Sequence, residues 1–363
     1  MFDRRLLKNL DFLIIGAVAA LTTISLFIIM SASPEDPLYF VKRQLVWVAI
    51  GLVAFVITLS IDYHDLGRYA RHLYYLNLAL LLATLVLGSE AKGAQRWLQF
   101  GPVVVQPSEF AKIIIIITLA QLLSEKASEI HTLKDLVPVF VHVGVPMALI
   151  LKQPDLGTSL VFAALLFVML FVAGVRWQYL AGLAAGGAAA APVLFHFLKD
   201  YQKKRLLVFL DPSVDPTGSG YHVIQSMIAI GSGRLWGKGL FGGTQNRLGF
   251  LPEQHTDFIF SVIGEELGFV RAAGILALYF IIIYRGIRVA ARARDDFGTL
   301  LATGVVTMLA FHVLVNVGMT TGIMPVTGIP LPFMSYGGSS YLTNMIALGL
   351  LLNVHMRRHK ILF

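Results

Sequence analysis

Long apolar runs are the feature that most constrains the fold of this chain. They recur along its 363 residues and are separated by mostly short polar loops. About 20 mostly apolar residues suffice for a helix to cross the hydrocarbon core of a bilayer, and a helix pairs its backbone polar groups internally. The pattern predicts an all-α polytopic membrane protein with about ten transmembrane helices.

The predicted spans lie at residues 12–30, 45–59, 73–87, 108–123, 136–151, 159–175, 179–198, 269–284, 299–319 and 341–354. We expect a helical lead-in at 257–267 before the eighth span. A long hydrophilic connection at about 199–256 precedes it, and the apolar residues within that connection, such as Trp236, indicate partial order at the membrane surface. The whole chain 1–363 is expected to form one integral membrane domain.

Composition supports a membrane protein and argues against nucleic-acid binding. Hydrophobic residues make up 56% of the chain and charged residues only 14%, whereas soluble domains are about 25% charged. A net charge of +8 would suggest nucleic acid in a soluble chain. Here it is better explained by basic residues that collect in cytoplasmic loops. The chain has no cysteine, which excludes disulfides and cysteine-ligated metals.

The distribution of basic residues predicts the orientation. An even number of spans places both termini on one side. The terminal segments and the short loops of that side hold most of the short-loop basic residues, among them Arg4, Arg5, Lys8, Arg68, Arg71, Arg176, Arg285, Arg288, Arg357 and Arg358. Both termini are therefore expected to be cytoplasmic, with the long connection between spans seven and eight outside the cytoplasm.

Two similar corners begin the fourth and sixth predicted spans on the outer side. They read Gln106-Pro107-Ser108-Glu109 and Gln153-Pro154-Asp155. Proline suits a first helical turn, and an acid there faces the positive end of the helix dipole. Glu109 and Lys112 share one helix face, so they form either an ion pair that anchors the helix end or a bundle-facing pair near a substrate. Asp155 is either a helix-terminal acid or a functional one.

A dense polar stretch, 248–269, lies at the edge of the eighth span. It contains Glu253, His255, Asp257 and the pair Glu265 and Glu266. Charge beside a membrane span is costly, which makes the stretch a functional-site hypothesis. The alternatives are that Asp257 caps the helix 258–267 and that the glutamates pair with Arg271. No second histidine stands at ligand spacing from His255, so no metal site is assigned.

Polar residues near the C-terminus add to this outer site. His312 and Asn316, four residues apart, are expected to form inter-helix hydrogen bonds. The loop that follows them is rich in glycine and proline, and its segment 335–340 leads into the last helix. Free amide groups at a helix start favour anions, which makes Ser335 and Gly337 candidate substrate contacts. A tight turn is the alternative.

Four motifs together resemble the SEDS family of shape, elongation, division and sporulation proteins, and most closely its elongation member. They are Gln106-Pro107-Ser108-Glu109-Phe110-Ala111-Lys112, Gln153-Pro154-Asp155-Leu156-Gly157-Thr158-Ser159, Leu251-Pro252-Glu253 through His255-Thr256-Asp257-Phe258-Ile259-Phe260, and Pro330-Leu331-Pro332-Phe333 through Ser335-Tyr336-Gly337-Gly338-Ser339-Ser340. The resemblance covers essentially the whole chain.

The resemblance implies a peptidoglycan glycosyltransferase of the bacterial inner membrane that polymerises lipid II on the outer face. The family's catalytic carboxylate falls on Asp257, and its other important polar positions fall on Glu109, Lys112 and Asp155. Lipid II, membrane lipids, a class B penicillin-binding protein and other elongation-complex proteins are the implied partners.

The expected mechanism needs one base and positive charge for the leaving diphosphate. Asp257 is the expected base. The leaving diphosphate would be stabilised by Lys112, by a basic residue of the long connection such as Arg205 or Arg234, or by a divalent cation (Mg or Mn). Two other functions stay open, a lipid II flippase and a non-catalytic scaffold. The charges cluster on one side of the membrane, which argues against a transport path.

Overall fold

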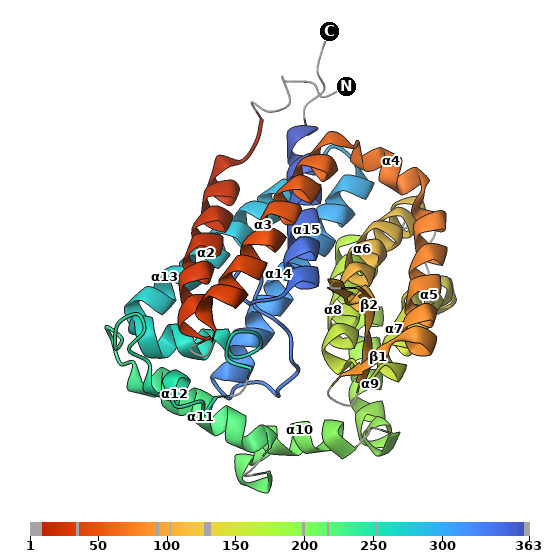
Figure 1. The fold of residues 1–363 in the computed structure, drawn as a ribbon. Coiled ribbons are helices and arrows are strands. Elements are labelled where there is room, and N and C mark those ends of the chain that lie inside the picture. The colour runs from red at the N-terminus through yellow and green to blue at the C-terminus, as the bar shows by residue number, and fades with distance from the viewer. Residues whose placement is uncertain are drawn as a thin grey trace.

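The structure is a computed structural model that describes residues 9–33, 36–91, 94–101, 103–126, 132–197, 200–215, 218–251 and 253–358. The basic residues Arg4, Arg5 and Lys8, and Pro252 of the third motif, lie outside these ranges. Within them the chain is a bundle of long helices, with a layer of shorter elements across one end (Figure 1).

Each predicted span falls on a helix, which confirms the all-α polytopic fold. The ten helices are α2 (Phe12–Ser31), α3 (Pro37–Ser60), α5 (Ala70–Leu87), α6 (Pro107–Lys126), α7 (Val137–Lys152), α8 (Leu156–Val172), α9 (Trp177–Phe197), α13 (Ile259–Ala291), α14 (Asp296–Thr320) and α15 (Gly338–Met356). Among the described residues, seven helical segments are long and apolar enough to cross a membrane, and α8 is a shorter apolar helix.

Aspartate residues set where several of these helices begin. Asp11 accepts hydrogen bonds from the amides of Leu13 and Ile14 at the start of α2, and Asp295 accepts one from Gly298 at the start of α14. Such side chains pair amide groups that have no partner within the helix. The same signal was missed at α3, which begins at Pro37 with Asp36 as its cap, whereas the predicted second span began only at residue 45.

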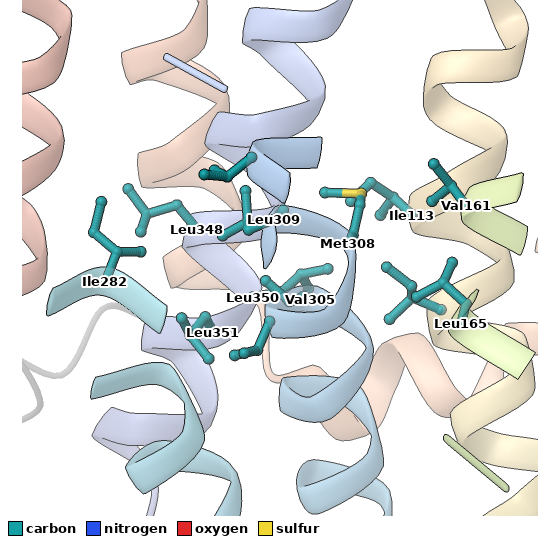
Figure 2. Packing of buried hydrophobic residues seen from close by; sticks show 14 of the residues in the cluster. Ile113, Val161, Leu165, Ile282, Val305, Met308, Leu309, Leu348, Leu350 and Leu351 are labelled. Atoms are coloured by element: carbon teal, nitrogen blue, oxygen red, sulfur yellow. The ribbon is translucent and has the colours of Figure 1, made fainter. Parts of the chain in front are cut away.

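Helix α14 lies at the centre of the bundle and packs against α6, α8, α13 and α15. In both α14 and α6 the most apolar stretch is 72% buried, against 17% in the peripheral α3. Figure 2 shows Val305, Met308 and Leu309 of α14 among apolar side chains of its neighbours. Gly304 lets Ile116 of α6 approach closely. The apolar middle of the bundle therefore forms a rigid support for what lies at its end.

The two ends of the bundle differ (Figure 1). One end holds α4 (Tyr63–Arg68) and η2 (Leu133–Leu136). The other holds the antiparallel strands β1 (Ser89–Ala91), β2 (Ala94–Phe100) and β3 (Val103–Val105), together with α10 (Asp200–Leu210), η3 (Pro212–Val214), α11 (Ser219–Ser232) and α12 (Thr244–Arg247). The expected partial order of the long connection is confirmed. The small sheet was not predicted, because strands this short carry little periodicity.

Helix α13 is broken at Gly268, between the predicted lead-in at 257–267 and the predicted eighth span. Gly268 has φ 75° and ψ 178°, a backbone conformation that favours glycine. Residues 234–239 cross the break and pair the freed backbone groups: Phe269 N donates to Arg234 O, and Lys238 N and Gly239 N donate to Glu265 O and Glu266 O. The first segment of α13 is thereby fixed to the long connection.

The glutamates before this break do not pair with Arg271, so that expectation was wrong. Glu265 lies 2.7 Å from Lys238 Nζ and also accepts from the Thr244 amide, whereas Glu266 accepts from the Ser31 hydroxyl. Both glutamates are buried, and a buried carboxylate needs such donors. The partners come from the long connection and α2, which sequence spacing cannot reveal.

Candidate active site

A cavity of about 960 Å³ opens at the end of the bundle that holds the short elements. Its walls come from α3, β2, β3, α6, α8, α10 and α14, from residues 253–257, and from residues 327–340. Four cationic side chains line it, Arg43, Arg96, Lys112 and Arg205, as do four carboxylates, Glu109, Asp155, Glu253 and Asp257. All four sequence motifs therefore contribute to one site.

Asp257 lies in the cavity wall just before α13. A tight turn places it there, in which the amides of Thr256 and Phe258 donate to Glu253 O. A Cβ atom added to Gly328 would lie 3.2 Å from Asp257 Oδ2 and 4.0 Å from Arg205 Nη1, so the carboxylate and the guanidinium face the same spot. The alternative that Asp257 caps the following helix was wrong: the N-cap residue of α13 is Phe258, without a side-chain cap.

Three hydrogen-bonded contacts hold the glycine- and proline-rich loop against this turn. Ser335 Oγ donates to Thr256 O over 2.6 Å, and Tyr336 N donates to His255 O over 2.9 Å. Asn316 of α14 donates to both Asp257 O and Ile329 O, at 2.9 and 2.8 Å. The expected inter-helix hydrogen bond of Asn316 was wrong, because its partners are backbone carbonyls of residues that lie outside the helices.

Neither Ser335 nor His255 lines the cavity, and both instead bond to residues of its wall. Ser335 is buried, and its hydroxyl is engaged with Thr256 and Leu331. The ring of His255 packs against Phe40 and Tyr336. Gly337 does line the cavity, as the N-cap of α15, and the ring of Trp47 packs directly on Gly338.

The two Gln-Pro-acid corners meet at Asp155. Its carboxylate accepts hydrogen bonds from Ser108 Oγ at 3.1 Å and from Gln106 Nε2 at 3.3 Å, and it also caps α8 through the Thr158 amide. Arg96 of β2 lies 3.9 Å from Asp155 Oδ1. Asp155 is thus both a helix-terminal acid and a cavity residue, so the two interpretations of it were compatible.

Glu109 and Lys112 form a buried ion pair that faces the bundle. Lys112 Nζ lies 2.8 Å from Glu109 Oε1 and 3.3 Å from His312 Nε2 of α14. All three residues are buried, and all three line the cavity. A buried charge needs such partners, because removing it from water costs several kcal/mol. The predicted pair is confirmed, and His312 joins it across helices.

Of the two loop cations predicted for the site, the structure places only Arg205 in the cavity. Arg234 is exposed and does not line it. Arg43 of α3 and Arg96 of β2 were not predicted for the site, yet both line the cavity, and Arg96 binds the carbonyls of Gln153 and Pro154. Neither arginine belongs to one of the four motifs, so the sequence carried no signal that separates them from other basic residues near the ends of the spans.

Tyr336 adds a neutral polar group to the cavity wall. Burial raises the pKa of the Tyr336 phenol, and the nearby Arg43 opposes this shift. The phenol therefore keeps its proton at neutral pH and can donate a hydrogen bond. Within the described ranges, no three His, Asp or Glu side chains lie close enough together to hold a metal ion.

Comparison with known proteins places this architecture in a family. A family model described as cell cycle protein (FtsW, RodA, SpoVE) matches residues 7–360. Peptidoglycan glycosyltransferase MrdB of Escherichia coli (strain K12) is 42% identical over 351 residues, which cover 96% of this chain and 94% of that protein.

Two solved structures share the fold. One, described as the structural coordination of polymerization and crosslinking by a peptidoglycan synthase complex, has a TM-score of 0.84 at 36% identity and covers 97% of this chain and 99% of that one. The other, the rod shape determining protein RodA of Thermus thermophilus, has a TM-score of 0.74 at 31% identity and covers 97% and 98%. The matches span nearly the whole chain, and on this evidence it belongs to the FtsW/RodA/SpoVE family, the SEDS proteins.

Proposed function

We propose that this protein is a peptidoglycan glycosyltransferase that polymerises lipid II into β-1,4 glycan strands for cell elongation and rod shape. The observation that carries the proposal is a cavity at one end of a membrane bundle, in which the carboxylate of Asp257 lies beside cationic side chains. The name of the Escherichia coli relative supports the activity, and that of the Thermus thermophilus structure supports the role in rod shape.

Asp257 serves as the general base in this proposal. It takes the proton from the 4-hydroxyl of the acceptor GlcNAc as that oxygen attacks the anomeric carbon of the donor MurNAc. The α-linked diphosphate leaves and a β-1,4 bond forms, with inversion. One carboxylate suffices because a diphosphate leaves without a proton from a general acid, unlike the alcohol in glycoside hydrolysis.

The cations of the cavity stabilise the departing diphosphate. Arg205 lies near Asp257, and Arg43, Arg96 and Lys112 complete the cationic lining. Positive charge that is already in place where negative charge develops lowers the barrier strongly, because no reorganisation is needed at the moment of reaction. A divalent cation on the diphosphate stays an expectation; glycan synthesis measured across EDTA and Mg²⁺ or Mn²⁺ titrations would test it.

The orientation and the partner are also proposals. The cavity-free end carries arginines such as Arg68 of α4 and Arg288 in the last turn of α13, which supports a cytoplasmic position for that end and an outer-face site in the bacterial inner membrane. A class B penicillin-binding protein is the proposed partner, supported by the polymerisation and crosslinking complex whose structure this chain resembles. Other elongation-complex proteins are proposed only by family resemblance.

A lipid II flippase is the alternative that shares this fold. A transport path would need polar groups across the bundle. Beyond the cavity, however, the described core around α14 is apolar, with Ile113, Val305, Met308 and Leu309 in contact with their neighbours (Figure 2). This favours chemistry at one face over transport.

Reconstitution with a class B penicillin-binding protein and fluorescent lipid II tests the proposal. Asp257→Asn is expected to lower glycan synthesis about 10²- to 10⁴-fold, the usual contribution of a general base. Asp211→Asn changes an exposed aspartate of the same connection and should leave synthesis unchanged. Full synthesis by Asp257→Asn would move the base elsewhere. No synthesis by the native protein, with lipid II crossing the vesicle bilayer, would favour the flippase.

A further inference from the structure

His312 is a cavity residue to which the reaction above gives no role. It lies on α14, fully buried, and its Nε2 atom is 3.3 Å from Lys112 Nζ. Lys112 in turn lies 2.8 Å from Glu109 Oε1. An inter-helix hydrogen bond explains one ring nitrogen of His312. It does not explain the other.

The contact with Lys112 decides which nitrogen carries the proton. A lysine ammonium can only donate, so Nε2 of His312 must accept, and the neutral ring then carries its hydrogen on Nδ1. A doubly protonated ring would place two cations against each other. The His312 Nδ1 atom is buried and has no hydrogen-bond partner among the described residues. A buried donor without a partner is costly, which points to a ligand that completes it.

We infer that His312 is a diphosphate-binding and positioning residue: its Nε2 orients the Lys112 ammonium, and its Nδ1–H donates to an anionic oxygen of the lipid-linked diphosphate. The inference rests on the proposed function and deepens it. The ammonium has three hydrogens, and Glu109 and His312 engage two of them, so a ligand in the cavity can accept the third. The two donors together suit a phosphate oxygen.

Helix α14 carries His312, which binds the diphosphate in this proposal, and also a residue that holds the general base. Asn316, one turn further along, holds the backbone of Asp257. Residues four apart share one face of a helix, and the most apolar stretch of α14 is 72% buried in the bundle. A single rigid element therefore sets the separation between the diphosphate donors and the general base.

Two substitutions separate the two ring nitrogens. The amide of glutamine falls near the position of Nε2, so His312→Gln keeps an acceptor for Lys112 and loses the Nδ1 donor. The amide of asparagine falls near Nδ1, so His312→Asn keeps a donor there and frees Lys112. His142→Gln is the matched control, because His142 of α7 bonds Thr118 between helices and does not line the cavity.

Binding of geranylgeranyl diphosphate and of its monophosphate to the purified protein is measured beside glycan synthesis. Both His312 variants should bind the diphosphate about tenfold or more weakly, the size expected for loss of a hydrogen bond to a charged group, with KM for lipid II raised. The affinity for the monophosphate should differ less between the native protein and the two variants. His142→Gln should change thermal stability only. Wild-type diphosphate binding and KM in both His312 variants would overturn the inference.

Two further readouts keep the test decisive. In native protein labelled with ¹⁵N-histidine, His312 should show the Nδ1-protonated neutral tautomer and respond to the diphosphate. An Nε2-protonated or charged ring would contradict the inference without any variant. Diphosphate binding is read independently of catalysis, so a native protein that binds it but makes no glycan would fail the proposed function and not the role of His312.

Discussion

The position of the Asp257 carboxylate depends on the absence of a side chain at Gly328. Gly328 has φ 74°, and its missing side chain leaves the space that Asp257 and Arg205 share. Any side chain there meets both backbone strain and the carboxylate. The site therefore depends on a residue that takes no part in the chemistry.

Gly328→Ala is expected to lower glycan synthesis about tenfold or more, because the added methyl displaces the Asp257 carboxylate, the proposed base, by a fraction of an ångström. Gly174→Ala is the control: Gly174 has φ 85° with nothing within 4 Å of an added Cβ, so it carries the strain without the contact. Initial rates and melting temperatures of both variants check this. Equal rates would refute a steric role for Gly328.

Asn316 holds the backbone of Asp257, the proposed general base, and offers a second test. Asn316→Ala leaves the carbonyls of Asp257 and Ile329 without this donor, at a cost of about 1–3 kcal/mol in the free energy of unfolding, and should lower the rate about tenfold. Asn353→Ala removes similar bonds to Thr58 O and Ile61 O at the opposite end of the bundle. It should lose stability alone, and a matching loss of rate would contradict the local role of Asn316.

Among the elements, the broken helix α13 matters most for the site. Its first segment carries on directly from Asp257, and residues 234–239 clamp the break through backbone hydrogen bonds. A continuous helix would have no groups free to make this clamp. The break therefore couples the long connection to the position of Asp257.

Gly268→Ala should open the clamp, because an added Cβ would overlap the backbone of Trp236 and Gly237 and φ is 75°. We expect a loss of several kcal/mol in stability and faster hydrogen exchange in residues 234–239. Gly274→Ala, in the same helix with open space around it, should instead gain about 1 kcal/mol. Unchanged exchange in Gly268→Ala would show that the clamp forms without the break.

For the molecule as a whole, the orientation in the membrane can be tested directly, because the native chain has no cysteine. A membrane-impermeant maleimide should label Ser213→Cys, at the cavity end, in intact spheroplasts. It should label Ala291→Cys, an exposed position near the other end, only after permeabilisation. The reverse pattern would place the cavity inside and exclude lipid II polymerisation on the outer face.

The sequence by itself determined the helices, their order and the candidate base. Apolar length and the Gln-Pro-acid corners at helix starts act locally, because each satisfies or frees backbone groups within a few residues. Glu109, Lys112 and Asp155 stood out because polar groups beside membrane spans are costly. The role of Asp257 came from the family resemblance, and Arg205 was proposed as a basic residue of the long connection.

Only the tertiary structure decided which of these polar groups meet. It brought Arg43, Arg96 and His312 into the cavity, placed Arg234 on the surface, and gave Glu265 and Glu266 partners in other elements instead of Arg271. Spacing along one helix predicts neighbours three or four residues away. Contacts between distant segments, such as Lys112 with His312, depend on how whole helices pack, which no local pattern encodes.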